Sequence, residues 1–160
     1  MIKGKDIIVV GIQAWDIEIG SNCKNIALEF AKNNRVLYVN PPLVRSSERK
    51  DKHKESIQKR IRIKEGLEPD LVEIESNLWN LYPKNTIESI NWIGIHSIFK
   101  ILNKRNSRRF ANDITSAASR LDFKNVILFN DSSMFLGLHL KEFLQPKVSV
   151  YYMRDYLVKV

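Results

Sequence analysis

The chain of 160 residues contains only one cysteine and three histidines. A single cysteine excludes a disulfide within the chain, and no histidine stands at a metal-ligand spacing from another histidine or from the cysteine. We therefore predict no metal site, and we interpret His53, His96 and His139 as surface or helix residues. Cys23 falls in the first turn of a predicted helix, where a small packed side chain is favoured over a reactive thiol.

Three sequence signatures of common enzymes are also absent. The chain has no GxxxxGK[ST] motif, which disfavours a P-loop nucleotidase. Its first loop lacks GxGxxG and its second predicted strand ends in Asn40, where a nicotinamide dehydrogenase would have an acid to hold the ribose. There is no Gly-x-Ser-x-Gly elbow of the kind that hydrolases use. We predict that the protein uses no cofactor.

Long apolar runs are missing as well. No stretch of 18 apolar residues occurs, and the amino terminus has no apolar core of a signal peptide. We therefore expect neither secretion nor a membrane span, and we expect the protein in the cytoplasm. The formal net charge of +8 indicates attraction to an anionic partner, whether nucleic acid, anionic lipid or a phosphorylated ligand.

What the sequence does contain is an alternation of strands and helices. The continuous apolar run Ile7 to Gly11 is typical of a buried parallel strand. A helix from Ser21 to about Asn33 and a strand Arg35–Val39 follow, and together they predict a right-handed βαβ unit. Further strands are predicted at Leu78–Tyr82, Val126–Phe129 and Val148–Tyr152.

The remaining segments are predicted from apolar spacing and charge. Stripes of apolar residues predict two helices, one around residues 95–102 and one around 110–121, separated by the basic join Lys104–Arg109. A third helix is predicted from Met134 to about Leu144. Residues 45–64 hold nine Lys or Arg against three acids, so we interpret them as a mobile, solvated basic loop. The alternative is a patch that faces an anion or a membrane.

This pattern predicts a single α/β domain over residues 1–160, with a Rossmann-like, doubly wound and mostly parallel sheet. Such sheets bind ligands beyond the carboxyl ends of their strands, so the site residues are expected in loops 13–20, 40–45, 130–133 and 153–155. The chain stops at Val160 without a closing helix, which we interpret as the truncation of a longer protein.

The first of these loops holds most of the candidate binding residues. Gly20, Ser21 and Asn22 begin a helix, a position suited to a phosphate or a sugar hydroxyl. Asp16 and Glu18 are placed to bind acceptor hydroxyls or to act as a general base, and a solvated pair is the alternative. Trp15 is a residue for stacking on a sugar face or, equally, for packing against the first helix.

Polar residues also follow the last two predicted strands. Asn130 and Asp131 follow one strand, and Asp131, Ser132 and Ser133 are all able to cap the next helix. Asp131 is also a candidate ligand contact, and the two roles do not exclude each other. Arg154 and Asp155 end the other, as an exposed ion pair or, in a cleft, as a site for phosphate or carboxylate.

Two stretches of sequence resemble a known family. The run VVGIQAWDIEIGSNCKNIALEFAKNNRVLYVNPP resembles the opening of the group 1, family 4-like glycosyltransferases of GT-B fold. Ile127–Asp131 and Val150–Asp155 resemble the fourth and fifth strands of the same amino-terminal domain. The resemblance is dense over residues 7–42 and 125–156 and thin over 45–120.

The resemblance implies the amino-terminal half of a GT-B fold. The whole enzyme would move a sugar from a nucleotide-sugar donor to a glycan, a lipid-linked or a small-molecule acceptor, with this half holding mainly the acceptor. Gly20 with Ser21 and Asn22 matches the loop that approaches the donor diphosphate. Asn130 and Asp131, and then Arg154 and Asp155, match the loops that contribute cleft residues, and Asp131 and Asp155 become the catalytic candidates. The donor domain is missing, so we expect the fragment alone to be inactive.

Two alternatives remain open from the residues themselves. The first is a non-catalytic α/β module that binds an anionic ligand or nucleic acid through residues 45–64. Nucleic acid is the less favoured partner, because residues 45–56 have no aromatic side chains among the basic ones. The second keeps the transferase and adds peripheral contact with anionic membrane, at the inner face, through residues 45–64 and Lys104–Arg109.

Overall fold

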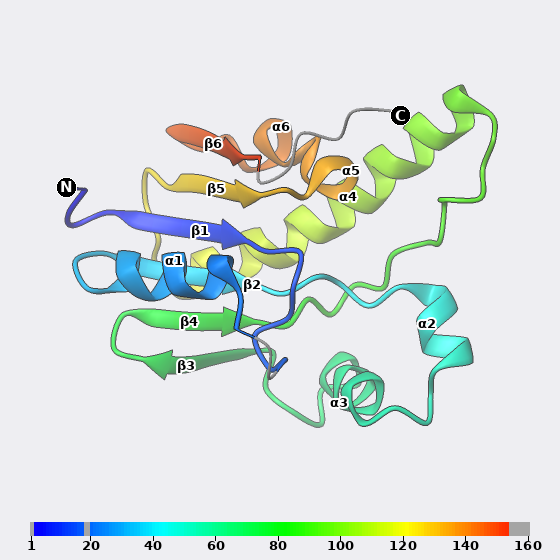
Figure 1. The fold of residues 1–160 in the computed structure, drawn as a ribbon, viewed down its shortest axis with the longest axis horizontal. Helices are drawn as coiled ribbons and strands as arrows, with labels where there is room; N and C mark the ends of the chain where they lie inside the picture. Colours follow the sequence, from blue (N-terminus) through cyan, green and yellow to red (C-terminus); the bar gives the residue numbers. More distant parts are fainter. Residues whose placement is uncertain (1, 18–19, 154–160) are drawn as a thin grey trace.

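The computed structural model describes residues 2–17 and 20–153. They form a six-stranded sheet in the order β3-β4-β2-β1-β5-β6. The strands are β1 (Asp6–Val10), β2 (Arg35–Val39), β3 (Leu71–Glu75), β4 (Leu78–Leu81), β5 (Ile127–Asp131) and β6 (Val148–Tyr152). All neighbouring pairs are parallel except β3 and β4, which form an antiparallel hairpin at one edge (Figure 1).

The apolar run that predicted the first strand is the centre of the sheet. Each residue of β1 is buried, and β1 pairs with β2 on one side and with β5 on the other. Its alternating side chains enter two separate cores. Ile7 and Val9 face α1 (Asn22–Ala31), and Ile8 and Val10 face α4 (His96–Arg120).

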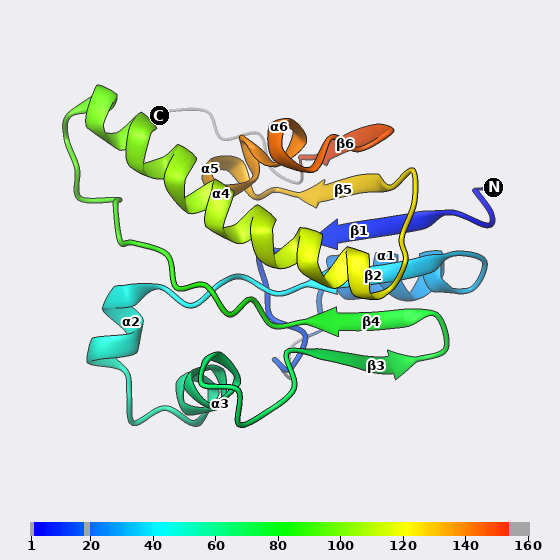
Figure 2. The same ribbon diagram turned by 180° about the vertical axis from the view of Figure 1, so that it is seen from behind.

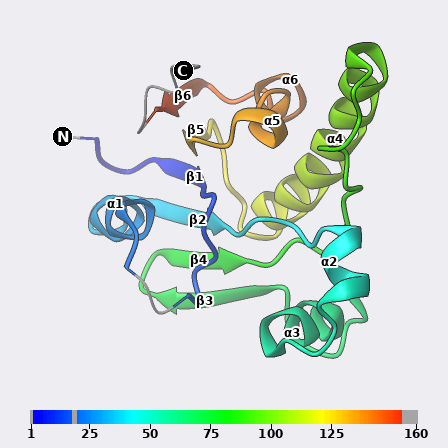
Figure 3. The same ribbon diagram turned by 45° about the vertical axis from the view of Figure 1, so that its right-hand side comes forward.

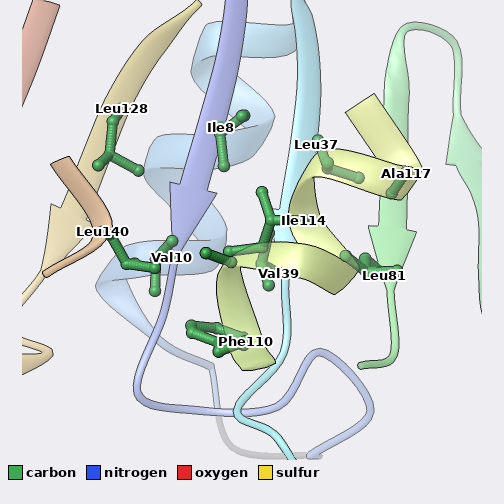
Figure 4. Packing of buried hydrophobic residues seen from close by; sticks show 11 residues of the cluster. Ile8, Val10, Leu37, Val39, Leu81, Phe110, Ile114, Ala117, Leu128 and Leu140 are labelled. Carbon is green, nitrogen blue, oxygen red and sulfur yellow. The ribbon is translucent and has the colours of Figure 1, made fainter. Parts of the chain in front are cut away.

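The helices cover both faces of this sheet. In Figure 1 α1 lies on one face, and in Figure 2 α4 crosses the other face, together with α5 (Met134–Gly137) and α6 (Leu140–Leu144). Figure 4 shows how Phe110 and Ile114 of α4 meet Val10 and Val39 of the central strands. The mostly parallel, doubly wound α/β prediction is confirmed at the level of the sheet and its two helical layers.

The order of the strands reverses beside β1. The chain first moves outward through β2 and β4, and α4 then carries it back to β5 on the other side of β1. In open α/β sheets ligands bind at such a switch, beyond the carboxyl ends of the strands. Those ends point to one side in Figure 3, where α2 (Arg45–Lys50) and α3 (Glu55–Lys64) also lie.

The predicted mobile basic loop at residues 45–64 is wrong, because the segment folds into α2 and α3. Two features that composition hides stabilise it. Ile63 of α3 is buried, and carboxylates neutralise several cations of the segment. Arg45 pairs with Glu88, and Lys64 of α3 pairs with Glu48 of α2. The basic side chains, which would repel one another in a solvated loop, thus form ion pairs within the segment and with Glu88 outside it.

The predicted break at the basic join Lys104–Arg109 is also wrong, because α4 is one helix of 25 residues. Its polar residues Asn103, Asn106 and Ser107 are buried and hydrogen bonded. They therefore act as contacts of a continuous helix and not as its solvated end.

Smaller differences concern the carboxyl-terminal third and the sheet edge. The single helix predicted from Met134 is two short helices, α5 and α6, and β5 extends as far as Asp131. Residues 71–75 add the antiparallel strand β3, which joins β4 through a turn with Asn77 at φ 66°. In the part of the chain that the structure describes, no helix has the length and apolar character needed to cross a bilayer.

Candidate binding site at the carboxyl edge of the sheet

The loop after β1 is held across the ends of β2 and β4 by Asn40. This side chain is fully buried, and its Oδ1 accepts a hydrogen bond from the backbone N–H of Trp15 at 2.7 Å. Its Nδ2 donates to Asn80 Oδ1 at 2.7 Å and to the Leu81 carbonyl at 2.8 Å. The asparagine that ends the second strand, in place of an acid, therefore directs the first loop toward α3.

Three polar side chains from three separate segments meet where that loop reaches α3. Lys59 Nζ lies 3.1 Å from Asp16 Oδ2 and donates to Tyr82 Oη at 2.9 Å. The Tyr82 hydroxyl donates to the same Asp16 oxygen at 3.2 Å. Tyr82 follows β4 and is almost fully buried, so it fixes the lysine and the carboxylate to the edge of the sheet.

Arg60 adds a second cation beside this trio. Its guanidinium lies over the Tyr82 ring, 5.6 Å from the ring centre, and donates to the Pro41 carbonyl. Among the described residues no carboxylate lies within ion-pair distance of Arg60. Partial burial lowers the pKa of the Arg60 guanidinium, so this half-buried positive charge has only partial compensation.

A cavity of about 410 Å³ opens beside these side chains. It is lined by residues of the first loop and of α3: Ala14, Asp16, Ile17, Glu55, Ser56, Lys59, Arg60 and Arg62. Cations, carboxylates and a hydroxyl surround the space, and its size suits a small polar ligand. We call this the α3 cavity.

The electrostatics of the trio keep both charges in place. Burial alone would raise the pKa of Asp16, but the hydrogen bond and the charge of Lys59 hold it below its ordinary value. Burial alone would lower the pKa of Lys59, but its bonds to Tyr82 and Asp16 raise it. Asp16 is therefore a carboxylate at neutral pH and a poor proton acceptor, better suited to accepting hydrogen bonds.

The start of α1 lies at the same edge, and the predicted cap is confirmed in part. The Ser21 hydroxyl accepts a hydrogen bond from the Lys24 N–H at 3.2 Å. Asn22 does not cap; its Nδ2 donates to Tyr152 Oη at 3.3 Å, which ties the helix to the end of β6. Gly20 is exposed, and a Cβ there would meet no atom within 4 Å.

The last two residues of β5 point to opposite faces of the sheet, as consecutive strand residues must. Asn130 faces α5 and closes the next turn, with bonds to the N–H and carbonyl of Ser133 at 3.0 and 3.2 Å. Asp131 is fully buried on the α1 face, where burial raises the pKa of Tyr38 and the charge of Asp131 adds a smaller effect in the same direction. The predicted cap at Asp131 is therefore wrong, whereas Ser133, another predicted cap residue, occupies the N-cap position of α5 and makes no side-chain cap bond.

The structure separates the predicted site residues into two groups. Asp16 lines the α3 cavity, whereas Asn130 lines a smaller space of about 320 Å³ beside α5. Trp15 packs edge-on against Tyr38, with 5.0 Å between the ring centres, so its observed contact is the packing alternative. Glu18, Arg154 and Asp155 lie outside the described residues.

Sequence reasoning missed Lys59, Arg60 and Tyr82. A signal for a helix was present in α3, because the apolar residues Ile57 and Ile61 stand four residues apart and therefore lie on one side of a helix. The excess of charge in that segment outweighed the spacing in our interpretation. In the described residues, no group of three or more His, Cys, Asp or Glu is placed to hold a metal ion.

Comparisons with known proteins do not extend this description. No family model matches the chain, and neither the curated proteins nor the solved structures contain a match.

Proposed function

We propose that this chain is the acceptor-side domain of a GT-B glycosyltransferase, an enzyme that moves a sugar from a nucleotide-sugar donor to a glycan, lipid-linked or small-molecule acceptor. The observation that carries the proposal is the Asp16, Lys59 and Tyr82 trio at the α3 cavity. The resemblance of residues 7–42 and 125–156 to that family and the reversal of strand order beside β1 support it.

The chemistry of the trio suits the hydroxyl groups of a sugar. An ionised carboxylate accepts hydrogen bonds from two neighbouring hydroxyls, and bonds to charged groups are the stronger ones. Because its pKa is depressed, Asp16 binds the acceptor in this proposal and is not the base that activates it. Lys59 and Arg60 supply donors for an anionic group on the same acceptor.

The donor would approach the start of α1, as the family resemblance implies. The open space around Gly20 leaves room for a diphosphate next to Ser21 and Asn22. Asp131 is fully buried and would act by positioning its neighbours, not by touching substrate. The catalytic assignment of Asp155, together with the substrate contacts of Glu18 and Arg154, remains a prediction.

Turnover by the full-length gene product tests the proposal. Incubated with a panel of nucleotide sugars and saccharide acceptors, that product should release nucleoside diphosphate. Asp16→Asn should raise the acceptor KM about tenfold, the scale of one lost charged hydrogen bond, and leave the donor KM unchanged. Asp122→Asn, which changes an exposed carboxylate whose one ion pair among the described residues is with Lys124, is the matched control. Absence of turnover across the whole panel would contradict the proposal.

A non-catalytic module for an anionic ligand is the second candidate, and Arg60 is the observation that favours it. A half-buried guanidinium without a described carboxylate partner is suited to a phosphate or carboxylate. Calorimetry with pyrophosphate distinguishes the two functions: binding that Arg60→Gln abolishes, without any transfer from nucleotide sugars, would favour the module. A filter-binding titration at two salt concentrations tests nucleic acid, whose binding would weaken steeply with salt.

A further inference from the structure

A cavity of about 390 Å³ lies where α2, the segment 82–95, α4 and α5 meet. Figures 1 and 2 show that segment running from the end of β4 past α2 to the start of α4. None of the described residues that line this cavity also lines the α3 cavity, so the two spaces are separate. The volume is that of a site for a small molecule. We call this space the Trp92 cavity, after the tryptophan in its wall.

Trp92 gives the cavity a fixed aromatic surface. Its side chain is 80% exposed, yet its Nε1 donates a hydrogen bond to the Ser89 carbonyl at 2.8 Å. That bond satisfies the one polar atom of the indole and orients the ring, so the surface left exposed is apolar. An apolar ring that is held in place and open to solvent is suited to stacking against a ligand.

A second aromatic side chain lines the same cavity. Phe135 of α5 packs edge-on against Phe99 of α4, with 5.5 Å between the ring centres, and it remains 56% exposed. Ile87 and Ile90 add aliphatic surface from the segment 82–95. Because much of the wall is apolar, a ligand that fills the cavity needs an apolar face of its own.

The cavity carries little free charge. Glu88 is the one charged residue among the described residues that line it. The Glu88 carboxylate lies 2.9 Å from Arg45 Nε and 3.2 Å from the Arg109 guanidinium, and these two partners hold its pKa below the ordinary value. The α3 cavity, in contrast, is lined by two carboxylates and three cations. The Trp92 cavity therefore favours a ligand without charge.

Neutral polar groups with unused hydrogen-bonding capacity complete the wall. Asn91 is exposed, and its side chain makes no described hydrogen bond. Asn103 is 3% exposed; its Nδ2 donates to the Phe135 carbonyl at 2.8 Å, and no described group donates to its Oδ1. The Ser46 hydroxyl accepts a bond from Ser89 at 2.6 Å, which leaves its own hydrogen without a described acceptor. The cavity thus offers uncharged donors and acceptors beside its aromatic surface.

We propose that the Trp92 cavity binds one neutral sugar unit of a saccharide. A pyranose ring has an apolar face of C–H groups, which would stack on Trp92, and a rim of hydroxyls, which would bond to Asn91, Asn103 and Ser46. A purely apolar ligand would leave the buried Asn103 oxygen without a partner, which is costly. This binding goes beyond the proposed transfer reaction, since it requires no donor, no turnover and no part of the Asp16 trio.

Titration of the 160-residue chain with neutral saccharides tests the proposal. At least one of glucose, maltotriose, cellotriose and triacetylchitotriose should shift the tryptophan emission to shorter wavelength, and Trp92→Phe should remove most of that shift. In saturation-transfer NMR the C–H hydrogens on one face of a sugar ring should receive the most saturation. Glucuronic acid should bind no more tightly than glucose, because Glu88 engages both nearby arginines.

Two substitutions measure the two kinds of contact. Trp92→Ala should weaken the binding of the saccharide about tenfold or more, because the stacking surface is lost. Asn91→Ala should weaken it about fivefold, the scale of one neutral hydrogen bond. Asn112→Ala, an exposed amide of α4 outside the cavity, is the matched control and should leave binding unchanged. Far-UV circular dichroism checks that each variant remains folded.

Four results would overturn the proposal. The first is absence of binding to every saccharide of the panel. The second is binding that Trp92→Ala and Asn91→Ala both leave intact. The third is binding that Asp16→Asn abolishes and Trp92→Ala does not, which would place the saccharide in the α3 cavity. The fourth is binding of uridine or adenosine that depends on Trp92 while no saccharide binds, which would assign the cavity to a planar base.

Discussion

Gly11, just after β1, is so closely surrounded by other side chains that it has no room for a side chain of its own. A Cβ built on it would stand 2.5 Å from Tyr38 Oη and 3.1 Å from Cys23 Sγ. The Tyr38 hydroxyl cannot easily move, because the ring is fully buried and the hydroxyl donates to the Gln13 carbonyl at 2.7 Å. The requirement for glycine here is therefore steric and not conformational.

Gly11→Ala should lower the free energy of unfolding by about 1–3 kcal/mol, the usual cost of an extra methyl in a packed interior. Adding Tyr38→Phe should recover part of that loss, because the closest atom disappears. Urea denaturation of the two single variants and the double variant measures the coupling. Gly20→Ala, where a Cβ meets nothing, should change stability by less than about 0.5 kcal/mol. Additive effects of Gly11→Ala and Tyr38→Phe would count against the contact.

Residue roles were predictable where the local sequence decides them. Ser21 caps α1 as its position before an apolar stripe predicted. Asp131 stands in an equally suggestive place, but β5 continues two residues past the predicted end at Phe129, and Asp131 is buried as its last residue. The pairing of Lys59 with Asp16 spans 43 residues of sequence, and no local pattern encodes such a contact.

At the scale of elements, α4 is organised by buried polar side chains as well as by its apolar stripe. Asn106 accepts a hydrogen bond from the Glu88 N–H at 3.0 Å and donates to the Glu88 carbonyl at 2.9 Å. This one side chain thus satisfies both backbone groups of a segment that runs beside the helix. The bond explains why the basic join continues as helix.

Asn106→Ala should lower the free energy of unfolding by about 1–3 kcal/mol, because it leaves backbone groups without partners. Asn112→Ala, six residues on and exposed, makes the same change in composition and should be close to neutral. Thermal or urea denaturation of both variants provides the comparison. Equal effects would mean that helix propensity, and not the bonds to Glu88, determines the result.

A second contact joins α4 to the start of the β3–β4 hairpin. Arg120 donates to both carboxylate oxygens of Asp70, at 3.1 and 2.8 Å. Burial alone would raise the pKa of Asp70, but the bond and the charge of Arg120 hold it below its ordinary value. Asp70 therefore contributes stability when ionised, and that contribution is lost as the pH falls through the folded-state pKa.

Arg120→Gln should accordingly weaken the protein at about pH 6 and have a smaller effect at the lowest pH at which the protein stays folded, because protonation of Asp70 in the folded state removes the charge that Arg120 binds. The difference should stay below ~1 kcal/mol, because Arg120 is partly exposed. Unfolding measured at both pH values, with Arg49→Gln as the control, tests this. A penalty of the same size at both would show that the ionised pair is not its source.

Helices and strands were predictable where the apolar residues follow one regular spacing along the sequence. The strand β1 and its neighbours β2 and β5 were predicted correctly, because the apolar residues of a buried strand are recognisable from the sequence alone. The helices α2 and α3 were not, since carboxylates as distant as Glu88 neutralise part of their charge. The alternation of residues 70–83 indicated strand, but it did not separate β3, whose side chains are mostly exposed, from the better candidate Leu78–Tyr82.

For the whole molecule, the order of elements predicted where the site lies but not which side chains meet there. Parallel strands bring their carboxyl ends to one edge whatever their sequence, so the location follows from topology. The direction in which the first loop crosses that edge depends on Asn40, whose partners Asn80 and Leu81 belong to a strand far along the chain. The α3 cavity could therefore be found only in three dimensions.

The same topology makes β1 common to both cores, which predicts one cooperative transition for the described domain. Ile7 and Val9 belong to the core on which Trp15 packs, and Ile8 and Val10 belong to the core on which Trp79 packs. Because both cores contain residues of β1, the loss of one core should disrupt the other as well.

Trp79→Phe with Trp92→Phe leaves Trp15 as the only tryptophan, and Trp15→Phe with Trp92→Phe leaves Trp79. In each variant, urea should reduce the tryptophan signal and the far-UV circular dichroism at the same midpoint. A Trp15 transition that precedes the loss of helix would instead mean that the α1 face opens alone.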